Sequence, residues 1–320
     1  MLAGLGFLSF GASALYCTRG HPEVTFFRDA WRVKRAWGSR PAVAGQPRAV
    51  ICGGSSAAFG IIPRQIEAKY GVPTVNMGLH AGFGPRLLTR VALREARSGD
   101  VLVLAIEPKL LVQEWDQPAL GVQFALASGL GGLLDKAGDG WRVGPDLTPY
   151  LALRPGAWHT LVLAGRTAAR KPLGRYLPGD LSTDGWMQTP IRWQVPSVVG
   201  KHLALSMDAR TELRSVAEWG RTNNVTVVYA LPWAYSAESD AAGLRASNLG
   251  LLREIAGIMP VIAGGNLGAV SDPGRFLDSE WHLDAKGAEA RSDELGEALR
   301  SRRFLSASDL DRPIQTPPAR

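Results

Sequence analysis

The feature that most constrains the fold is an apolar run at residues 49–52 and the glycines and serines that follow it. The run shows no polar alternation, which is typical of a central strand covered on both faces. Gly53 and Gly54 end it, and Ser55 and Ser56 lead directly into a helical stretch. Such a corner holds a hydroxyl beside the N–H groups of a helix N-terminus, which can face negative charge. The same residues also fit a glycine turn capped by serine.

Further short segments typical of buried strands recur along the chain. We expect strands at residues 72–76, 101–106, 225–231 and 260–263, separated by helices. Strands that alternate with helices form a parallel sheet with helices on both faces. The sequence therefore predicts one α/β domain over residues 48–304, a three-layer α/β/α sandwich with a flavodoxin-like parallel sheet of about five strands.

Three stretches stand apart from this alternation. Residues 110–207 are rich in Gly, Pro and Trp and too long for a plain loop, so we interpret them as an insertion after the third strand, with helices of its own. Residues 19–47 form a polar lead-in linker that ends in prolines. Residues 305–320 form a tail that we predict to be disordered.

The first 16 residues contain no charged side chain. Their length matches a signal-peptide core and falls a little short of the about 20 residues of a membrane-spanning helix. We interpret residues 1–18 as a membrane anchor or signal-like segment. Basic residues follow this segment but do not precede it, which under the positive-inside rule favours a cytoplasmic domain, so both locations stay open.

The charge and the cysteines exclude several classes of function. The net charge is +7, but the basic residues are spread along the chain without interleaved aromatics, so we expect no nucleic-acid partner. A basic surface also suits an anionic membrane or an acidic polymer. Cys17 and Cys52 are too few for a disulfide framework. The histidines lack metal-like spacing, and we predict neither a metal nor a cofactor.

A second polar segment lies near the end of the chain, where Asp278 precedes His282 by four residues. In a parallel sheet, ligands bind beyond the carboxyl ends of the strands, and both this segment and the Ser55 corner can reach that edge. A hydroxyl, an imidazole and a carboxylate together are what nucleophilic acyl transfer needs.

These segments, taken in order, resemble the SGNH (GDSL-like) hydrolase superfamily. Within it they resemble bacterial membrane-associated members whose first block reads Gly-Gly-Ser-Asn/Ser-x-x-Phe-Gly-Ile. Residues 51–61 match that block, residues 75–82 resemble the second block, and residues 278–287 resemble the closing one. The resemblance implies that Ser55 is the nucleophile, that His282 is the base and that Asp278 orients the imidazole.

The same resemblance leaves two assignments open. Ser56 is the alternative nucleophile, because Gly60 follows it at the spacing of the shorter family pattern. The implied oxyanion donors are the Ser55 backbone N–H and that of either Gly78 or Gly82.

The chain departs from the family pattern at three places. Gly54 replaces the Asp of Gly-Asp-Ser, and Asp278 stands four residues before the histidine where three is usual. Glu107 follows the third strand, where the family has an oxyanion-binding Asn. A carboxylate there would oppose an oxyanion, and the loss of one such donor can cost about 10²–10³ in rate.

Other residues are candidates for substrate contact at the same edge. Each has a plain alternative, since polar loop residues often face solvent and frequent tryptophans usually pack in the core. The candidates are Asn76, His80, Glu107, Trp233 and Trp281.

The resemblance implies a serine esterase or O-acyltransferase, with acetyl as the expected acyl group, acting on an envelope or exported polysaccharide. Its substrate would be an acylated carbohydrate or another ester, and its N-terminal segment would hold it on the extracytoplasmic face of a membrane. One alternative is a non-catalytic component of the same fold that binds a glycan or a polysaccharide-assembly partner. Another is a cytosolic hydrolase.

Overall fold

A five-stranded parallel sheet lies at the centre of the structure, a computed structural model that describes residues 2–114, 118–134, 165, 169, 176–201 and 203–312. The strand order is β2-β1-β3-β4-β6. The strands are β1 (Ala49–Gly53), β2 (Thr74–Asn76), β3 (Val101–Ala105), β4 (Thr226–Ala230) and β6 (Val261–Ile262). The predicted α/β sandwich with its parallel sheet is confirmed.

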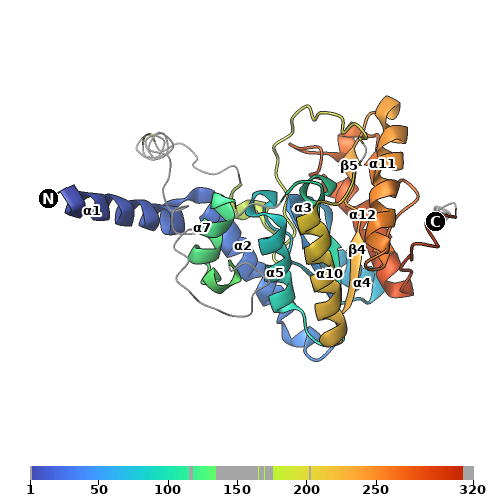
Figure 1. The fold of residues 1–320 in the computed structure, drawn as a ribbon, viewed down its shortest axis with the longest axis horizontal. Helices are drawn as coiled ribbons and strands as arrows, with labels where there is room; N and C mark the ends of the chain where they lie inside the picture. The colour runs from blue at the N-terminus through green and yellow to red at the C-terminus, as the bar shows by residue number, and fades with distance from the viewer. Residues whose placement is uncertain are drawn as a thin grey trace.

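Helices cover both faces of the sheet (Figure 1). Successive strand side chains point to opposite faces. Val50 and Cys52 of β1 pack into one core with side chains of α2, α5, α10 and α11, whereas Ala49 and Ile51 pack into the other with α4 and α12. The helix bounds are α2 (Pro22–Gly38), α4 (Pro63–Tyr70), α5 (Pro85–Glu95), α10 (Met207–Thr222), α11 (Glu238–Ala256) and α12 (Ala285–Ser301). Burial on both faces explains why the strand sequences lack alternation.

The register of the sheet brings two polar segments together at its carboxyl edge. Gly53, the last residue of β1, pairs with Ala105, the last residue of β3. The chain leaves β1 through Gly54 into the short helix α3 (Ser55–Gly60), and leaves β3 through Ile106 and Glu107 into α6 (Pro108–Leu111). Position 54 therefore emerges beside position 107.

The N-terminal region is more closely packed than a linker. Residues 22–38, predicted as part of the lead-in, form α2, in which Val24, Phe27, Ala30 and Lys34 are fully buried. This helix packs against β2 and against α7 (Ala119–Ala127) of the insertion. Its apolar residues recur at helical spacing, which lets one face join the core.

Helix α1 (Leu2–Leu15) extends away from the rest of the molecule (Figure 1) and joins α2 through a π-helical turn, η1 (Tyr16–Gly20). Leu8 and Leu15 on it are 70% and 54% exposed. Among the described residues, none of the helices combines the length and the apolar character that a membrane crossing requires.

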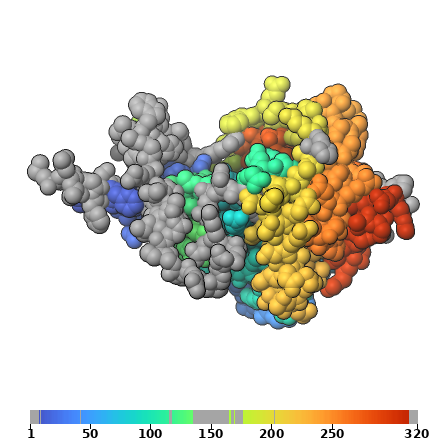
Figure 2. All heavy atoms as spheres, in the orientation of Figure 1, coloured from blue at the N-terminus to red at the C-terminus, as the bar shows by residue number. Residues whose placement is uncertain are grey.

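The insertion crosses the molecule in several segments, and much of it, residues 135–164 above all, lies outside the described residues. Residues 186–187 reach the end of α3, where the Met187 N–H donates to Ala58 O and the Trp186 indole donates to Phe59 O. Figure 2 shows the segment around residues 190–201 arching over the upper edge, and its Trp193 N–H donates to Leu277 O.

The end of the domain lies further along the chain than predicted. Leu305 pairs with Val261 of the edge strand β6 through two backbone hydrogen bonds, and Leu310 is 2% exposed. Residues 305–312 are therefore ordered, contrary to the prediction of a disordered tail from residue 305, because they complete the sheet edge and the core. Residues 313–320 lie outside the described residues.

Candidate active site

The Ser55 corner has the predicted strand–turn–helix form. Gly54 occupies the N-cap position of α3, and Ser55 is its first residue. Ser55 is partly exposed, whereas Ser56 is only 5% exposed. Within the described part of the chain, neither the hydroxyl nor the backbone N–H of Ser55 makes a hydrogen bond. Both groups can therefore face a substrate.

Asp278 and His282 form a buried pair. Nδ1 of His282 lies 2.7 Å from Oδ1 of Asp278, and the two side chains are 7% and 0% exposed. The loop between them is closed at its base by the Phe276–Leu283 bridge and by the hydrogen bond from Leu277 N to His282 O. This turn brings the two side chains together at the four-residue spacing that differs from the family pattern.

The imidazole lies on the same side of α3 as Ser55. The His282 ring stacks on Phe59, with centroids 4.3 Å apart and an interplanar angle of 15°. Residues four apart on a helix share one face, and helical side chains lean toward the N-terminus, so Phe59 lies on the Ser55 face of α3. No hydrogen bond joins Ser55 to His282 among the described residues. Catalytic hydrogen bonds are often long until substrate binds.

Ser56 faces the other way. Its hydroxyl oxygen is enclosed and has no hydrogen-bond partner in the described part of the molecule. It lines a narrow pocket with Trp233, Leu283 and Arg291. Of the two serines, Ser55 is the one that precedes Phe59, the residue in contact with the imidazole, by one helical turn.

Glu107 lies directly under the first turn of α3. It is 1% exposed, and its Oε1 accepts a hydrogen bond of 3.0 Å from the Ser56 N–H. A carboxylate next to a helix N-terminus is favourable for the helix but unfavourable for a second negative charge at that place. The structure places the Glu107 carboxylate at the N-terminus of α3, and its conflict with an oxyanion stays a prediction.

The glycines implied as second oxyanion donors already have partners. The Gly78 N–H donates to Oδ1 of Asn76, and the Gly82 N–H donates to Nδ1 of His80, each at 2.9 Å. Of the donors named from the sequence, the Ser55 N–H is the one that this structure leaves open.

Asn76 is buried and forms hydrogen bonds within the fold. It is fully buried, and its amide donates to Ala57 O and Ile61 O at 2.8 Å each. These bonds tie the end of β2 to α3 and satisfy carbonyls at the end of that helix. We therefore correct the expectation that Asn76 contacts substrate.

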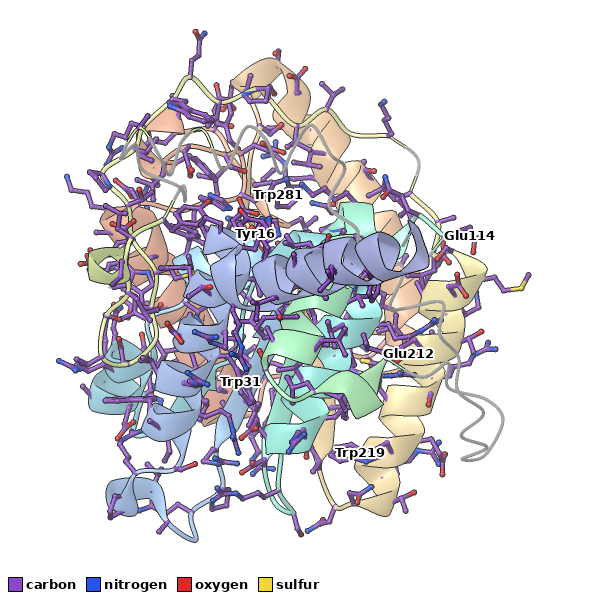
Figure 3. All side chains as sticks on the ribbon, turned by 90° about the vertical axis from the view of Figure 1, so that its left-hand side faces the viewer. Tyr16, Trp31, Glu114, Glu212, Trp219 and Trp281 are labelled. Carbon is purple, nitrogen blue, oxygen red and sulfur yellow. The ribbon has the colours of Figure 1, made fainter. Side chains whose placement is uncertain are left out.

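The two tryptophans proposed for sugar stacking are packed against protein. Trp281 is 6% exposed, lies among crowded side chains just above α1 in the view of Figure 3, and has Lys109 Nζ 5.5 Å from its ring centroid. Trp233 donates from Nε1 to Glu294 and packs with Phe276 and Leu283. Trp281 offers no open ring face, which corrects its assignment as a stacking platform.

A cluster of aromatic side chains, Phe27, Phe59 and Tyr176, lies near His282, and the sequence did not predict it. The Tyr176 ring centroid lies 5.5 Å from that of Phe59 and 6.5 Å from that of His282. Phe27 of α2 contacts Tyr176 and also His80, at 6.2 and 5.3 Å between centroids. The position of Phe59, four residues after Ser55, was the available sequence signal. Phe27 and Tyr176 lie in segments that carried no motif.

Burial also shifts the pKa values of two groups near Glu107, the Cys52 thiol and the Tyr229 hydroxyl. It raises the pKa of the Cys52 thiol to about 12, with the nearby Glu107 carboxylate adding to the effect and a hydrogen bond with Thr89 opposing it. Burial and the same carboxylate raise the pKa of Tyr229. A thiol that stays protonated is a poor nucleophile, so Cys52 is a poor candidate for that role.

In the described part of the chain, no group of three or more His, Cys, Asp or Glu side chains is placed to hold a metal ion. Compared with protein-family models, with curated proteins and with solved structures, the chain matches none. Family membership therefore remains a proposal.

Proposed function

We propose that this chain is an SGNH-like serine esterase or O-acyltransferase that acts on ester-linked acyl groups, acetyl above all, of an envelope or exported polysaccharide. One observation carries the proposal: the buried Asp278–His282 pair stacks on Phe59, on the face of α3 that carries Ser55. A nucleophile, a base and an orienting carboxylate thereby share one edge of the sheet.

In this mechanism the Ser55 Oγ attacks the ester carbonyl carbon while Nε2 of His282 takes its proton. The Asp278 carboxylate holds the Nδ1–H and stabilises the imidazolium. The carbonyl oxygen, now negative, faces the Ser55 N–H. The intermediate then expels the alcohol, which takes the proton from His282, and leaves the acyl group on Ser55. Water or a sugar hydroxyl repeats the steps in reverse and releases the acid or the transferred ester.

The resemblance and the net charge support the proposed substrate class and location. A net charge of +7 suits an acidic polymer or an anionic membrane surface. The exposed apolar residues of α1 suit attachment to a bilayer, and the resemblance alone supports its extracytoplasmic face.

The proposal is tested by hydrolysis of p-nitrophenyl acetate and of acetylated oligosaccharides. We expect activity in the wild type and in Ser56→Ala, and its loss in Ser55→Ala and His282→Ala. Ser292→Ala serves as a matched control, since Ser292 accepts a hydrogen bond from the Ile62 N–H and lies outside the reaction path. Equal activity in Ser55→Ala and wild type contradicts the proposal.

One observation favours a second candidate, a non-catalytic component that binds a glycan or an assembly partner at the same edge. The Glu107 carboxylate at the N-terminus of α3 opposes the charge that ester cleavage develops. A folded protein that binds acetylated glycan, and whose serines do not react with a fluorophosphonate, would support this candidate over the esterase.

A further inference from the structure

Two departures from the family pattern, Gly54 and Glu107, are neighbours in space: the Glu107 carboxylate fills the position that a side chain at residue 54 would take. β1 and β3 pair in register up to Gly53 and Ala105, so the residues that follow lie side by side. A Cβ atom added at Gly54 would lie 2.5 Å from Oε1 and 2.6 Å from Oε2 of Glu107. Real Cβ atoms do not approach other heavy atoms so closely, and the carboxylate, being 1% exposed, has little room to move aside.

The same carboxylate caps the helix that carries Ser55. Gly54 holds the N-cap position but has no side chain to accept from the first turn. Glu107 accepts instead from the Ser56 N–H at 3.0 Å, reaching across from the end of the neighbouring strand. Its other oxygen, Oε2, is enclosed and has no hydrogen-bond partner among the described residues.

We propose that Glu107 is a positioning residue for Ser55 and that the absence of a side chain at Gly54 leaves the space that the Glu107 carboxylate needs. We also propose that the negative charge of Glu107 slows acylation of Ser55. The carboxylate holds the first turn of α3, which fixes the Ser55 N–H and hydroxyl. The same negative charge lies close to where the carbonyl oxygen of the substrate becomes negative. Glu107 therefore positions Ser55 but weakens stabilisation of the oxyanion. The claim about rate rests on the proposed function, whereas the claim about shared space does not.

The rate claim is tested with Glu107→Gln, which keeps an acceptor oxygen but removes the charge. We expect its unfolding equilibrium constant in urea to stay within about threefold of wild type, and its rate of labelling by a fluorophosphonate to rise about tenfold or more. Glu107→Ala loses the cap, and we expect its unfolding constant to rise about fivefold or more. A faster reaction at unchanged stability is a readout that a purely structural residue would not produce.

Ser206→Ala is the matched control, because Ser206 caps α10 by accepting from the Ala209 N–H at 3.1 Å. We expect it to raise the unfolding constant as Glu107→Ala does, without changing the labelling rate. A folded Glu107→Gln protein that labels no faster than wild type overturns the claim that the charge slows Ser55.

The shared space is tested by a double-mutant cycle. Gly54→Ala should raise the unfolding constant more than about tenfold in wild type but less than about threefold in Glu107→Ala, where the space is free. An equal effect in both backgrounds overturns the shared-space claim. If no variant labels while this coupling is observed, the esterase function fails and the structural claim stands.

Discussion

The imidazole of His282 lies almost flat on the ring of Phe59, at 4.3 Å between centroids and 15° between planes. The contact joins two segments more than two hundred residues apart, the helix after the first strand and the loop before the last helix. Because Phe59 follows Ser55 by one helical turn, the contact sets where the proposed base lies relative to the proposed nucleophile. It is the observation on which the proposed role of Ser55, rather than Ser56, rests.

Replacing Phe59 tests that contact. In Phe59→Leu we expect ester hydrolysis to fall at least about tenfold, because the imidazole loses the surface that orients it. The His282 ring protons, shifted upfield by the aromatic face in the wild type, should return toward ordinary values in the NMR spectrum.

Phe83→Leu is the control for Phe59, since Phe83 is 1% exposed and stacks on Phe124 at 4.4 Å and 18°. Both variants should lose roughly 1–3 kcal/mol of unfolding free energy. Unchanged His282 shifts in Phe59→Leu would mean that the ring is held by other contacts.

Asp278→Asn tests the orienting carboxylate. The amide retains the shape but no longer holds the Nδ1–H tautomer or the imidazolium, so we expect kcat for ester hydrolysis to fall by about 10³–10⁴. Asp272→Asn, in the same region but 61% exposed, should leave kcat unchanged. Comparable activity in the two variants would show that Asp278 serves the fold and not the reaction.

We expect Lys34 on α2 to make the free energy of unfolding depend on pH. Its side chain is fully buried and donates to Gly185 O, and burial lowers its pKa to about 7 from 10.5, although Asp184 acts to raise it. Between these two values the unfolded chain binds the proton that the folded chain has released. The free energy of unfolding should therefore rise with pH from about 7 to 10, by at most about 1.4 kcal/mol per pH unit.

Urea unfolding of the wild type and of Lys34→Met at pH 7.5 and 9.5 checks this expectation. The difference between the two proteins isolates the lysine from other titrating groups. We expect the wild type to gain stability relative to Lys34→Met as the pH rises. Parallel pH dependence in both proteins would show that Lys34 keeps its ordinary pKa when folded.

The exposed residues of α1 predict attachment to membranes. In Leu8→Asp, co-sedimentation with vesicles of phosphatidylcholine and phosphatidylglycerol should fall well below that of the wild type, since a charge at an apolar anchor is costly. Met207→Asp is the control, because Met207 is 79% exposed on α10 of the main body. Equal loss of binding in both variants, or none, contradicts attachment through α1.

Much of the fold could be predicted from hydrophobic pattern alone. The strand at residues 101–106 is an unbroken apolar run, and that at residues 225–231 is broken only by the exposed Thr226. Burial on both faces produces that pattern. The helix predicted from Asp284 to Arg300 is found at Ala285–Ser301, because Asp284 accepts from the Gly287 N–H as its cap. Local chemistry decides such boundaries.

Other features depend on contacts that no local pattern carries. The buried ion pair of Arg48 with Asp100, at 2.7 Å, also reaches Gly38 O and Glu95 O, so it fastens α2 to the sheet. The sequence predicted a lead-in linker at α2 because the surface against which its apolar face packs forms only when the domain folds. The sequence likewise predicted that Asn76 contacts substrate, because its hydrogen-bond partners, Ala57 O and Ile61 O, come close to it only in the folded chain.

In the candidate site, Ser55, Asp278 and His282 were predicted from motif order, and the structure pairs the last two. The role of Glu107 as a cap could not be predicted, because it depends on the register that sets Gly53 opposite Ala105. The four-residue spacing between Asp278 and His282 departs from the usual three, and the Phe276–Leu283 bridge closes the loop so that the two side chains still meet.

The most direct measurement is to treat the intact protein with a fluorophosphonate and locate the adduct by mass spectrometry of its peptides. The proposed chemistry predicts an adduct on Ser55, none on Ser56, and none anywhere in His282→Ala. An adduct on Ser56, or labelling of Ser55 that persists at the wild-type rate without His282, would contradict it.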